Sequence, residues 1–155
     1  MRSVFRFISL FLLLSVSGCG DEDCNLDCFT PPNPFLFELV DKTSGENLFS
    51  NGTYRAEDIT VVDRLTGQGL EFGFISEKEQ NIIAIHSIGW ETEVVDALVS
   101  HGADDIFTLF VDAERLSENC CSFTRYKDIR IGIAEYQKDP ASDIYSILID
   151  TGSQP

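Results

Sequence analysis

The chain has 155 residues, of which 26 are Asp or Glu and only 11 are Lys or Arg, so its formal net charge is −15. This charge excludes nucleic-acid binding through a phosphate-neutralising basic face and adsorption to anionic lipid through clustered Lys and Arg. The length fits one domain, and 43% hydrophobic residues, with 12 Phe among them, are enough to bury a core.

Residues 1–18 have the pattern of a secretory signal peptide. Arg2 and Arg6 form a short positive region, a largely apolar run from Phe7 to Leu14 follows, and small residues end the segment. The run is well short of the ~20 residues that a spanning helix needs. We therefore expect residues 1–18 to be removed and the protein to be exported. Their removal takes two basic residues and no acidic ones, so the remaining chain is even more acidic.

The residues around the expected cleavage site indicate the type of signal. Val16-Ser17-Gly18-Cys19 resembles the bacterial lipobox, in which the cysteine thiol carries a diacylglycerol and the freed amine is usually acylated. This resemblance predicts lipidation of Cys19 and membrane attachment through an N-terminal lipid anchor. The alternative is an ordinary signal peptide cleaved nearby. The acidic residues 20–23 resemble the surface-export signal of Bacteroidetes lipoproteins, or else form a solvated tether.

The other four cysteines predict two structural disulfides in an exported chain. Cys120 and Cys121 are adjacent, so their Cα atoms lie ~3.8 Å apart, below the usual 4.4–6.8 Å of a disulfide. Cys24 and Cys28 are then expected to reach across to this pair and to pin the tether to the domain, while the connectivity between the two pairs stays open. A four-cysteine zinc site is disfavoured because zinc ligands are rarely adjacent.

The rest of the chain predicts one all-β domain over residues 35–152, preceded by an acidic tether over residues 19–34. The proline-rich segment 31–34 marks the boundary, because proline cannot join a central strand. Short runs of two-residue periodicity, separated by turn residues such as Asn51-Gly52, follow it. The runs predict strands at Phe35–Val40, Ile59–Asp63, Leu70–Phe74, Asn81–Ile88, Ile106–Val111, Ile129–Ile133 and Ile144–Ile149. An antiparallel β-sandwich of seven to eight strands, immunoglobulin-like or transthyretin-like, is the expected fold.

Residues 92–101 are the ambiguous segment. Trp90, Val94 and Leu98 have helical spacing, Thr92 could cap a helix, and Gly102 could end it. A strand over Glu93–Leu98 is favoured, because everything around the segment is β.

The sequence carries no recognisable catalytic, metal-binding or cofactor-binding motif. The two histidines, His86 and His101, are not spaced as zinc ligands, and no nucleophile elbow, phosphate loop or dinucleotide fingerprint is present. Carboxylates are so abundant that no pair of them points to a glycosidase site. We expect no catalytic residue, no metal and no cofactor, and interpret both histidines as surface or structural side chains.

The phrase LVDKTSGENLF, starting at Leu39, and the later Asn51-Gly52-Thr53-Tyr54 resemble the start of small uncharacterised lipoproteins of Bacteroidetes, which also tend to carry a late Cys-Cys pair. The resemblance implies no known activity. A looser likeness to the carboxypeptidase regulatory, transthyretin-like sandwich concerns architecture alone.

Three functional hypotheses follow. The first is a lipid-anchored, disulfide-stapled module at the outer membrane that binds a protein or glycan partner and is displayed on the cell surface. The second is a periplasm-facing accessory of an envelope complex. The third, and least favoured, is a carboxylate-dependent hydrolase.

Overall fold

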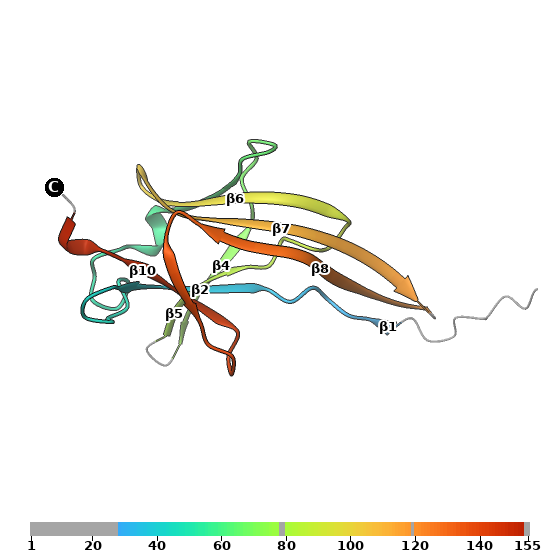
Figure 1. The fold of residues 1–155 in the computed structure, drawn as a ribbon, viewed down its shortest axis with the longest axis horizontal. Coiled ribbons are helices and arrows are strands. Elements are labelled where there is room, and N and C mark those ends of the chain that lie inside the picture. The colour runs from blue at the N-terminus through green and yellow to red at the C-terminus, as the bar shows by residue number, and fades with distance from the viewer. Residues whose placement is uncertain (1–27, 78–79, 119, 154–155) are drawn as a thin grey trace, which may run out of the picture.

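A computed structural model describes residues 28–77, 80–118 and 120–153 (Figure 1). These residues form ten β-strands and two short 3-10 helices, η1 (Ala56–Asp58) and η2 (Thr151–Ser153). The strands are β1 (Cys28–Phe29), β2 (Phe35–Asp41), β3 (Ile59–Asp63), β4 (Phe72–Glu77), β5 (Gln80–Ile85), β6 (Glu93–His101), β7 (Asp104–Glu118), β8 (Cys121–Gly132), β9 (Glu135–Lys138) and β10 (Ile144–Ile149). Within this part of the chain, no helix is long and apolar enough to cross a membrane.

The strands form two five-stranded sheets packed as a sandwich, which confirms the predicted all-β fold. Sheet A has the order β1-β8-β7-β6-β3, and sheet B has the order β4-β5-β2-β10-β9. The prediction of purely antiparallel sheets is wrong, because β1 pairs with β8 and β10 pairs with β2 in parallel. The predicted seven to eight strands are also too few. The short β1 and β9 are exposed along their whole length, so they lack the alternation that marks a half-buried strand.

The core lies between the sheets and is built from alternate residues of the central strands. Phe35, Phe37 and Leu39 of β2 point inward from sheet B, and Phe107, Leu109 and Val111 of β7 point inward from sheet A. The rings of Phe37 and Phe107 meet across the two sheets, with centroids 4.7 Å apart. The two-residue period of the sequence therefore marks these inward positions.

The ambiguous segment 92–101 contains a strand, β6, which confirms the interpretation favoured from the sequence. Val95, Ala97 and Val99 are buried, while Asp96 and Leu98 between them are half-buried. β6 pairs with β3 on one side and with β7 on the other. Its three valines, Val94, Val95 and Val99, suit a strand better than a helix.

The chain passes from sheet A to sheet B immediately after β8. Ile133 has φ 73°, and β9 follows it in sheet B. Gly132 opposes Thr108 of β7, and a Cβ at residue 132 would lie 2.8 Å from Thr108 Oγ1. A side chain at residue 132 would require the Thr108 side chain to move, so glycine suits this close approach.

The sandwich is elongated, and its two ends differ (Figure 1). The entry end, where the described chain begins, contains β1, the last residues of β7 and the first residues of β8. The far end contains the connection between β2 and β3, the turn at Gly102 and the C-terminal residues up to 153. Because β2 and β7 run from one end to the other, features at the two ends are separated by the length of the core.

Candidate functional sites at the two ends of the sandwich

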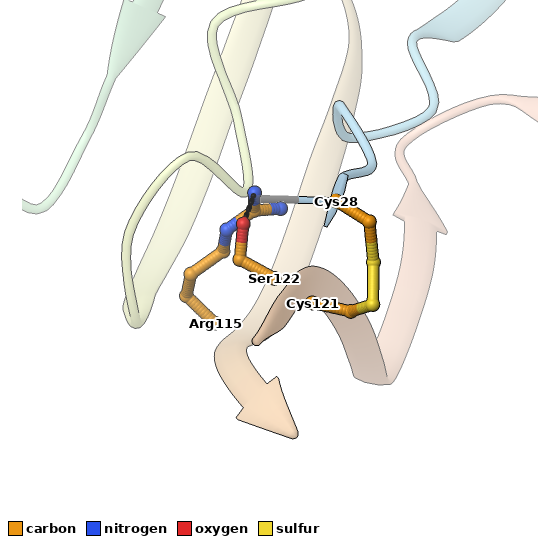
Figure 2. The surroundings of a disulfide bond; sticks show 4 residues. All are labelled: Cys28, Arg115, Cys121 and Ser122. Atoms are coloured by element: carbon orange, nitrogen blue, oxygen red, sulfur yellow. Dashed lines mark hydrogen bonds between the residues drawn. A yellow bond between two sulfur atoms is a disulfide. The ribbon is translucent and has the colours of Figure 1, made fainter. Parts of the chain in front are cut away.

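A disulfide closes the entry end. Cys28 of β1 and Cys121 of β8 are bonded to each other, with their Cα atoms 4.5 Å apart and paired in the sheet (Figure 2). Cys120 is also disulfide-bonded, and its φ of 65° places it in the left-handed region. The prediction that Cys28 reaches across to the Cys120/Cys121 pair is therefore confirmed.

The remaining cysteine predictions have different outcomes. Because Cys121 is bonded to Cys28, it is not bonded to the adjacent Cys120. Two cysteines joined in a disulfide do not offer the free thiolates that a zinc site needs. No group of three or more His, Cys, Asp or Glu side chains suited to a metal occurs within residues 28–77, 80–118 and 120–153. Cys19 and Cys24 lie outside the described residues, so the lipidation of Cys19 and the pairing of Cys24 stay predictions.

Arg115 of β7 joins three segments beside the disulfide. Its guanidinium donates to the carbonyl of Thr30 (2.9 Å), to Thr124 Oγ1 (2.8 Å) and to Ser122 Oγ (3.0 Å), the last of which is drawn in Figure 2. Charged donors make stronger hydrogen bonds than neutral ones. Arg115 therefore fixes the chain directly after β1 to the β7–β8 hairpin, independently of the covalent bond.

Two exposed aromatic rings lie next to Arg115. Phe29 is 58% exposed and Trp90 is 47% exposed, and their rings stack with centroids 5.9 Å apart. The Arg115 guanidinium lies 4.8 Å from the centroid of Phe29, a cation–π contact. The Trp90 indole N–H donates to the carbonyl of His86 at 2.7 Å. The pair is thus held in place by contacts to the chain on both sides.

Gly89 allows the segment that carries Trp90 to lie close to β8. Its φ is 94°, and a Cβ there would lie 2.9 Å from Tyr126 Oη and 3.0 Å from Thr124 Cγ2. The Gly89 N–H donates to Glu93 Oε1 at 2.6 Å, and Tyr126 Oη donates to the carbonyl of Asn33 at 3.0 Å. Burial of the phenol, together with the charge of Glu93, raises the pKa of Tyr126.

Gly89→Ala is expected to lower the free energy of unfolding by about 2–4 kcal/mol, because it adds a steric clash to the cost of a positive φ. Gly102→Ala is the matched control. Gly102 also has a positive φ, 60°, but nothing lies within 4 Å of its added Cβ, so only about 1–2 kcal/mol is expected. Urea unfolding of both variants measures the difference. Equal losses would show that the approach of Gly89 to Tyr126 is not tight in solution.

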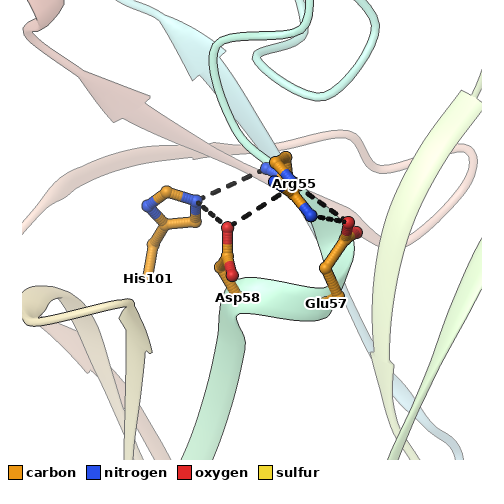
Figure 3. Close-up of polar contacts among 4 residues, drawn as sticks. All are labelled: Arg55, Glu57, Asp58 and His101. Atoms are coloured by element: carbon orange, nitrogen blue, oxygen red, sulfur yellow. Dashed lines mark hydrogen bonds and ion pairs between the residues drawn. The ribbon is translucent and has the colours of Figure 1, made fainter.

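A cluster of polar side chains lies at the far end (Figure 3). His101, at the end of β6, accepts a hydrogen bond at Nε2 from the main-chain N–H of Arg55 (3.4 Å) and lies 3.8 Å from Asp58 Oδ2. Its ring stacks on Tyr54 with centroids 4.2 Å apart. Because Nε2 accepts a hydrogen bond, the neutral ring carries its proton on Nδ1. These contacts tie the β2–β3 connection to β6.

Arg55 completes the same cluster. Its guanidinium Nε donates to Glu57 Oε1 at 2.8 Å and lies 3.8 Å from Asp58 Oδ2. The side chains of Arg55, Glu57 and Asp58 are 67%, 62% and 44% exposed. Water therefore screens their charges, and each ion pair adds little stability. The cluster shapes the surface of the far end rather than holding the fold together.

A shallow polar hollow of about 730 Å³ also lies at the far end. Asn47 Nδ2 donates to the carbonyl of Asn81 (3.1 Å), and Asn81 Nδ2 donates to Ser50 Oγ (2.8 Å). The remaining lining residues are Glu46 and Asn51. Amide and hydroxyl groups can both donate and accept, so this lining suits a hydroxyl-rich ligand better than an apolar one.

Asp41 organises the turn that leads from β2 into this region. Its Oδ1 accepts the main-chain N–H groups of Ser44 (2.7 Å) and Thr43 (3.0 Å), and its Oδ2 accepts the Thr151 hydroxyl. The Thr151 hydroxyl, followed by the Ser44 N–H, lowers the pKa of Asp41 from 3.8 to about 2. One carboxylate thus joins the β2 turn to the C-terminal segment.

The Asp41 carboxylate is expected to stabilise the fold above pH 4, and this contribution is expected to disappear as the pH falls through about 2. The sign follows from a folded-state pKa below that of the unfolded chain, near 3.9. Between pH 4 and pH 2, wild type should lose more stability than Asp41→Asn, as measured by urea unfolding. Thr151→Val should raise the pKa of Asp41, as followed by NMR titration. An Asp41 that titrates near 4 in the folded wild type would contradict the prediction.

Sequence reasoning missed the aromatic pair and Arg115. Phe29 belongs to a segment interpreted as tether, Trp90 lies just before the ambiguous segment 92–101, and Arg115 carries no motif. The one available signal was that Trp90 is the only tryptophan in the chain. Of the two histidines, His101 makes the contacts described above, while His86 lies just after β5 with an exposed side chain.

The comparisons with known proteins add no relative. The chain matches no protein-family model, no curated protein and no solved structure.

Proposed function

We propose that the chain is a lipid-anchored envelope protein whose β-sandwich binds a partner and performs no catalysis. The leader and the Val16-Ser17-Gly18-Cys19 sequence support attachment through lipid at Cys19. The disulfide between Cys28 and Cys121 supports export, because such bonds persist in oxidising compartments.

The position of that disulfide is the observation that carries the proposal. Cys28 is nine residues after Cys19, and its bond to Cys121 fixes the entering chain to one end of the sandwich. A lipid at Cys19 would therefore hold the entry end near the membrane and leave the far end accessible. Loops gathered at one end of a sandwich are a common position for binding residues.

The far end offers a surface for binding rather than for catalysis. His101 Nε2 is already hydrogen-bonded to the main chain, and the imidazole stacks on Tyr54 instead of lining a deep cleft. The hollow at the same end is open and lined by amide, hydroxyl and carboxylate groups. A glycan, which presents many hydroxyl groups, is the partner class that this lining fits best.

The anchor is tested with the full chain expressed in a Gram-negative host. We expect wild type in the membrane fraction, with a lipid-modified N-terminal Cys19 by mass spectrometry, and Cys19→Ser released into the soluble fraction. Cys24→Ser is the matched control, since it removes a neighbouring cysteine but should keep the lipid. A wild-type protein that is soluble and unmodified would overturn the proposal.

Surface display is tested separately by protease treatment of intact cells. Loss of the domain while a periplasmic protein survives would support display on the cell surface. Protection until the outer membrane is broken would instead place the domain on the periplasmic side and favour an envelope accessory. Binding of the purified domain to a glycan array, compared with Asn81→Ala, then tests the hollow, and equal binding by both proteins would exclude it as the binding site.

A further inference from the structure

The stacked pair of Phe29 and Trp90 is an apolar surface exposed to water at the entry end. Both rings are about half-exposed, and they lie in contact with each other, with centroids 5.9 Å apart. Isolated exposed apolar residues are ordinary, whereas adjoining aromatic rings mark an interaction surface. Aromatic residues with one apolar side are also those enriched where proteins meet lipid headgroups.

The local hydrogen bonds prepare these rings for an apolar environment. The Trp90 indole N–H already donates to the carbonyl of His86, so the ring can leave water without leaving its one donor unpaired. The Thr30 carbonyl, next to Phe29, is satisfied by Arg115. The Arg115 guanidinium also lies against the Phe29 ring, 4.8 Å from its centroid, and so stabilises its position.

The length of chain before β1 decides which surface the pair can reach. Cys28 is nine residues after Cys19, and a fully extended chain of that length spans at most about 30 Å. If Cys19 carries lipid, as the proposed function states, Cys28 stays within that distance of the bilayer at all times, and Phe29 is the next residue. The tether then gives the pair a high effective concentration at the membrane, so a weak contact is enough.

We infer that the Phe29–Trp90 pair docks on the lipid headgroup region of the membrane that holds the anchor. The contact is apolar rather than electrostatic, because the chain has a net charge of −15 and Glu91 and Glu93 lie beside Trp90. Zwitterionic lipid is therefore the matching surface, and anionic lipid repels the domain. Docking at the entry end directs the far end, with its polar hollow, away from the bilayer.

Trp90 is the only tryptophan in the chain, so its fluorescence reports this contact directly. The lipidated full chain is reconstituted into phosphatidylcholine vesicles whose acyl chains are either plain or brominated. We expect the Trp90 emission to shift to shorter wavelength on reconstitution and to lose intensity in the brominated vesicles. Cys19→Ser without lipid should show neither change, because two rings without the tether bind too weakly.

Two variants separate the aromatic pair from general proximity to the membrane. Phe29→Ser should reduce the quenching while the protein stays anchored. Ile75→Ser is the control, since Ile75 is an exposed apolar residue on β4, away from the entry end, and its loss should leave the quenching unchanged. Far-UV circular dichroism of both variants confirms that the sandwich is intact.

The outcomes distinguish this inference from the proposed function on which it rests. Anchored protein whose Trp90 is not quenched by brominated lipid and stays accessible to iodide would overturn the docking and leave the anchor standing. If Trp90 were unquenched in vesicles but shielded from iodide in isolated envelopes, the pair would bind a protein instead, which also overturns the inference. Protein that carries no lipid on Cys19 and does not bind vesicles would overturn the proposed function itself.

Discussion

Removal of the Cys28–Cys121 disulfide alone is expected to lower the free energy of unfolding by only about 2 kcal/mol, whereas removal of both disulfides lowers it by about 6–7 kcal/mol. The Cys28–Cys121 bond spans 93 residues of sequence. Closing a loop of that size restricts the unfolded chain by about 4–5 kcal/mol. The neighbouring Cys120 is also disulfide-bonded. With Cys24 as its partner, this second bond would close nearly the same loop, so either bond would keep most of the restriction.

The partner of Cys120 is predicted by elimination. Cys121 is bonded to Cys28, and the proposed function assigns Cys19 to lipid, which leaves Cys24. With one bridge intact, the other closes only the few residues from Cys24 to Cys28 and from Cys120 to Cys121, for which about 2 kcal/mol is expected. Because Cys120 and Cys121 are adjacent, partial reduction followed by stepwise alkylation and peptide mass spectrometry is needed to assign the bonds.

The losses of stability are measured by urea unfolding of three variants. They are Cys28→Ser/Cys121→Ser, Cys24→Ser/Cys120→Ser and the fourfold variant that combines them. The two pairs are each other's matched control, since both remove one bridge at the same end of the sandwich. The combined loss should exceed the sum of the two single losses by about 2–3 kcal/mol, which is a coupling energy. Additive losses would show that the two bonds do not close a shared loop.

Much of the sandwich could be predicted, because burial leaves a period of two in the sequence. Phe35, Phe37 and Leu39 were expected on one face of a strand, and they occupy the core side of β2. β9 could not be found this way, because it is an edge strand in which all four residues are exposed. An exposed strand is held by its main-chain pairing, and that pairing depends on a partner elsewhere in the chain.

The alternation of Ile129, Ile131 and Ile133 shows where the same reasoning fails. The pattern predicted one continuous strand over the three residues. Ile131 packs against the core, but Ile133 lies beyond β8 at a positive φ and is 66% exposed. The chain turns there from sheet A to sheet B, with Gly132 close to Thr108 just before the turn, and the apolar pattern does not mark this turn.

The sites at the two ends depend on contacts between residues far apart in sequence. Phe29 meets Trp90, and Arg115 reaches back to Thr30, only because the disulfide and the parallel pairing of β1 with β8 bring these segments together. The cysteine count predicted a disulfide link between the N-terminal segment and residues 120–121. The register of β7 with β8 decides which side chains surround that disulfide link, and no local sequence pattern specifies this register.

Phe37→Ala is expected to lower the free energy of unfolding by about 3–5 kcal/mol, because it removes a large, fully buried ring and leaves a cavity between the sheets. The ring of Phe37 lies 4.7 Å from that of Phe107 in sheet A and 5.5 Å from that of Tyr145 on the neighbouring strand β10. The substitution therefore weakens both the contact between the sheets and the packing within sheet B. Phe107→Ala should cost a similar amount from the opposite side of the core.

The double variant Phe37→Ala/Phe107→Ala tests whether these two rings form one contact. Because each single variant already loses the ring–ring interaction, the double loss should fall short of the sum of the two single losses by about 0.5–1.5 kcal/mol. Phe29→Ala is the matched control, since it removes the same side chain from a surface position and should cost about 1 kcal/mol or less. Urea unfolding of wild type and the four variants gives the values. If Phe37→Ala lowered the free energy of unfolding no more than Phe29→Ala, a core built on the contact between β2 and β7 would be contradicted. The packing of the two sheets, which separates the entry end from the far end, would be contradicted with it.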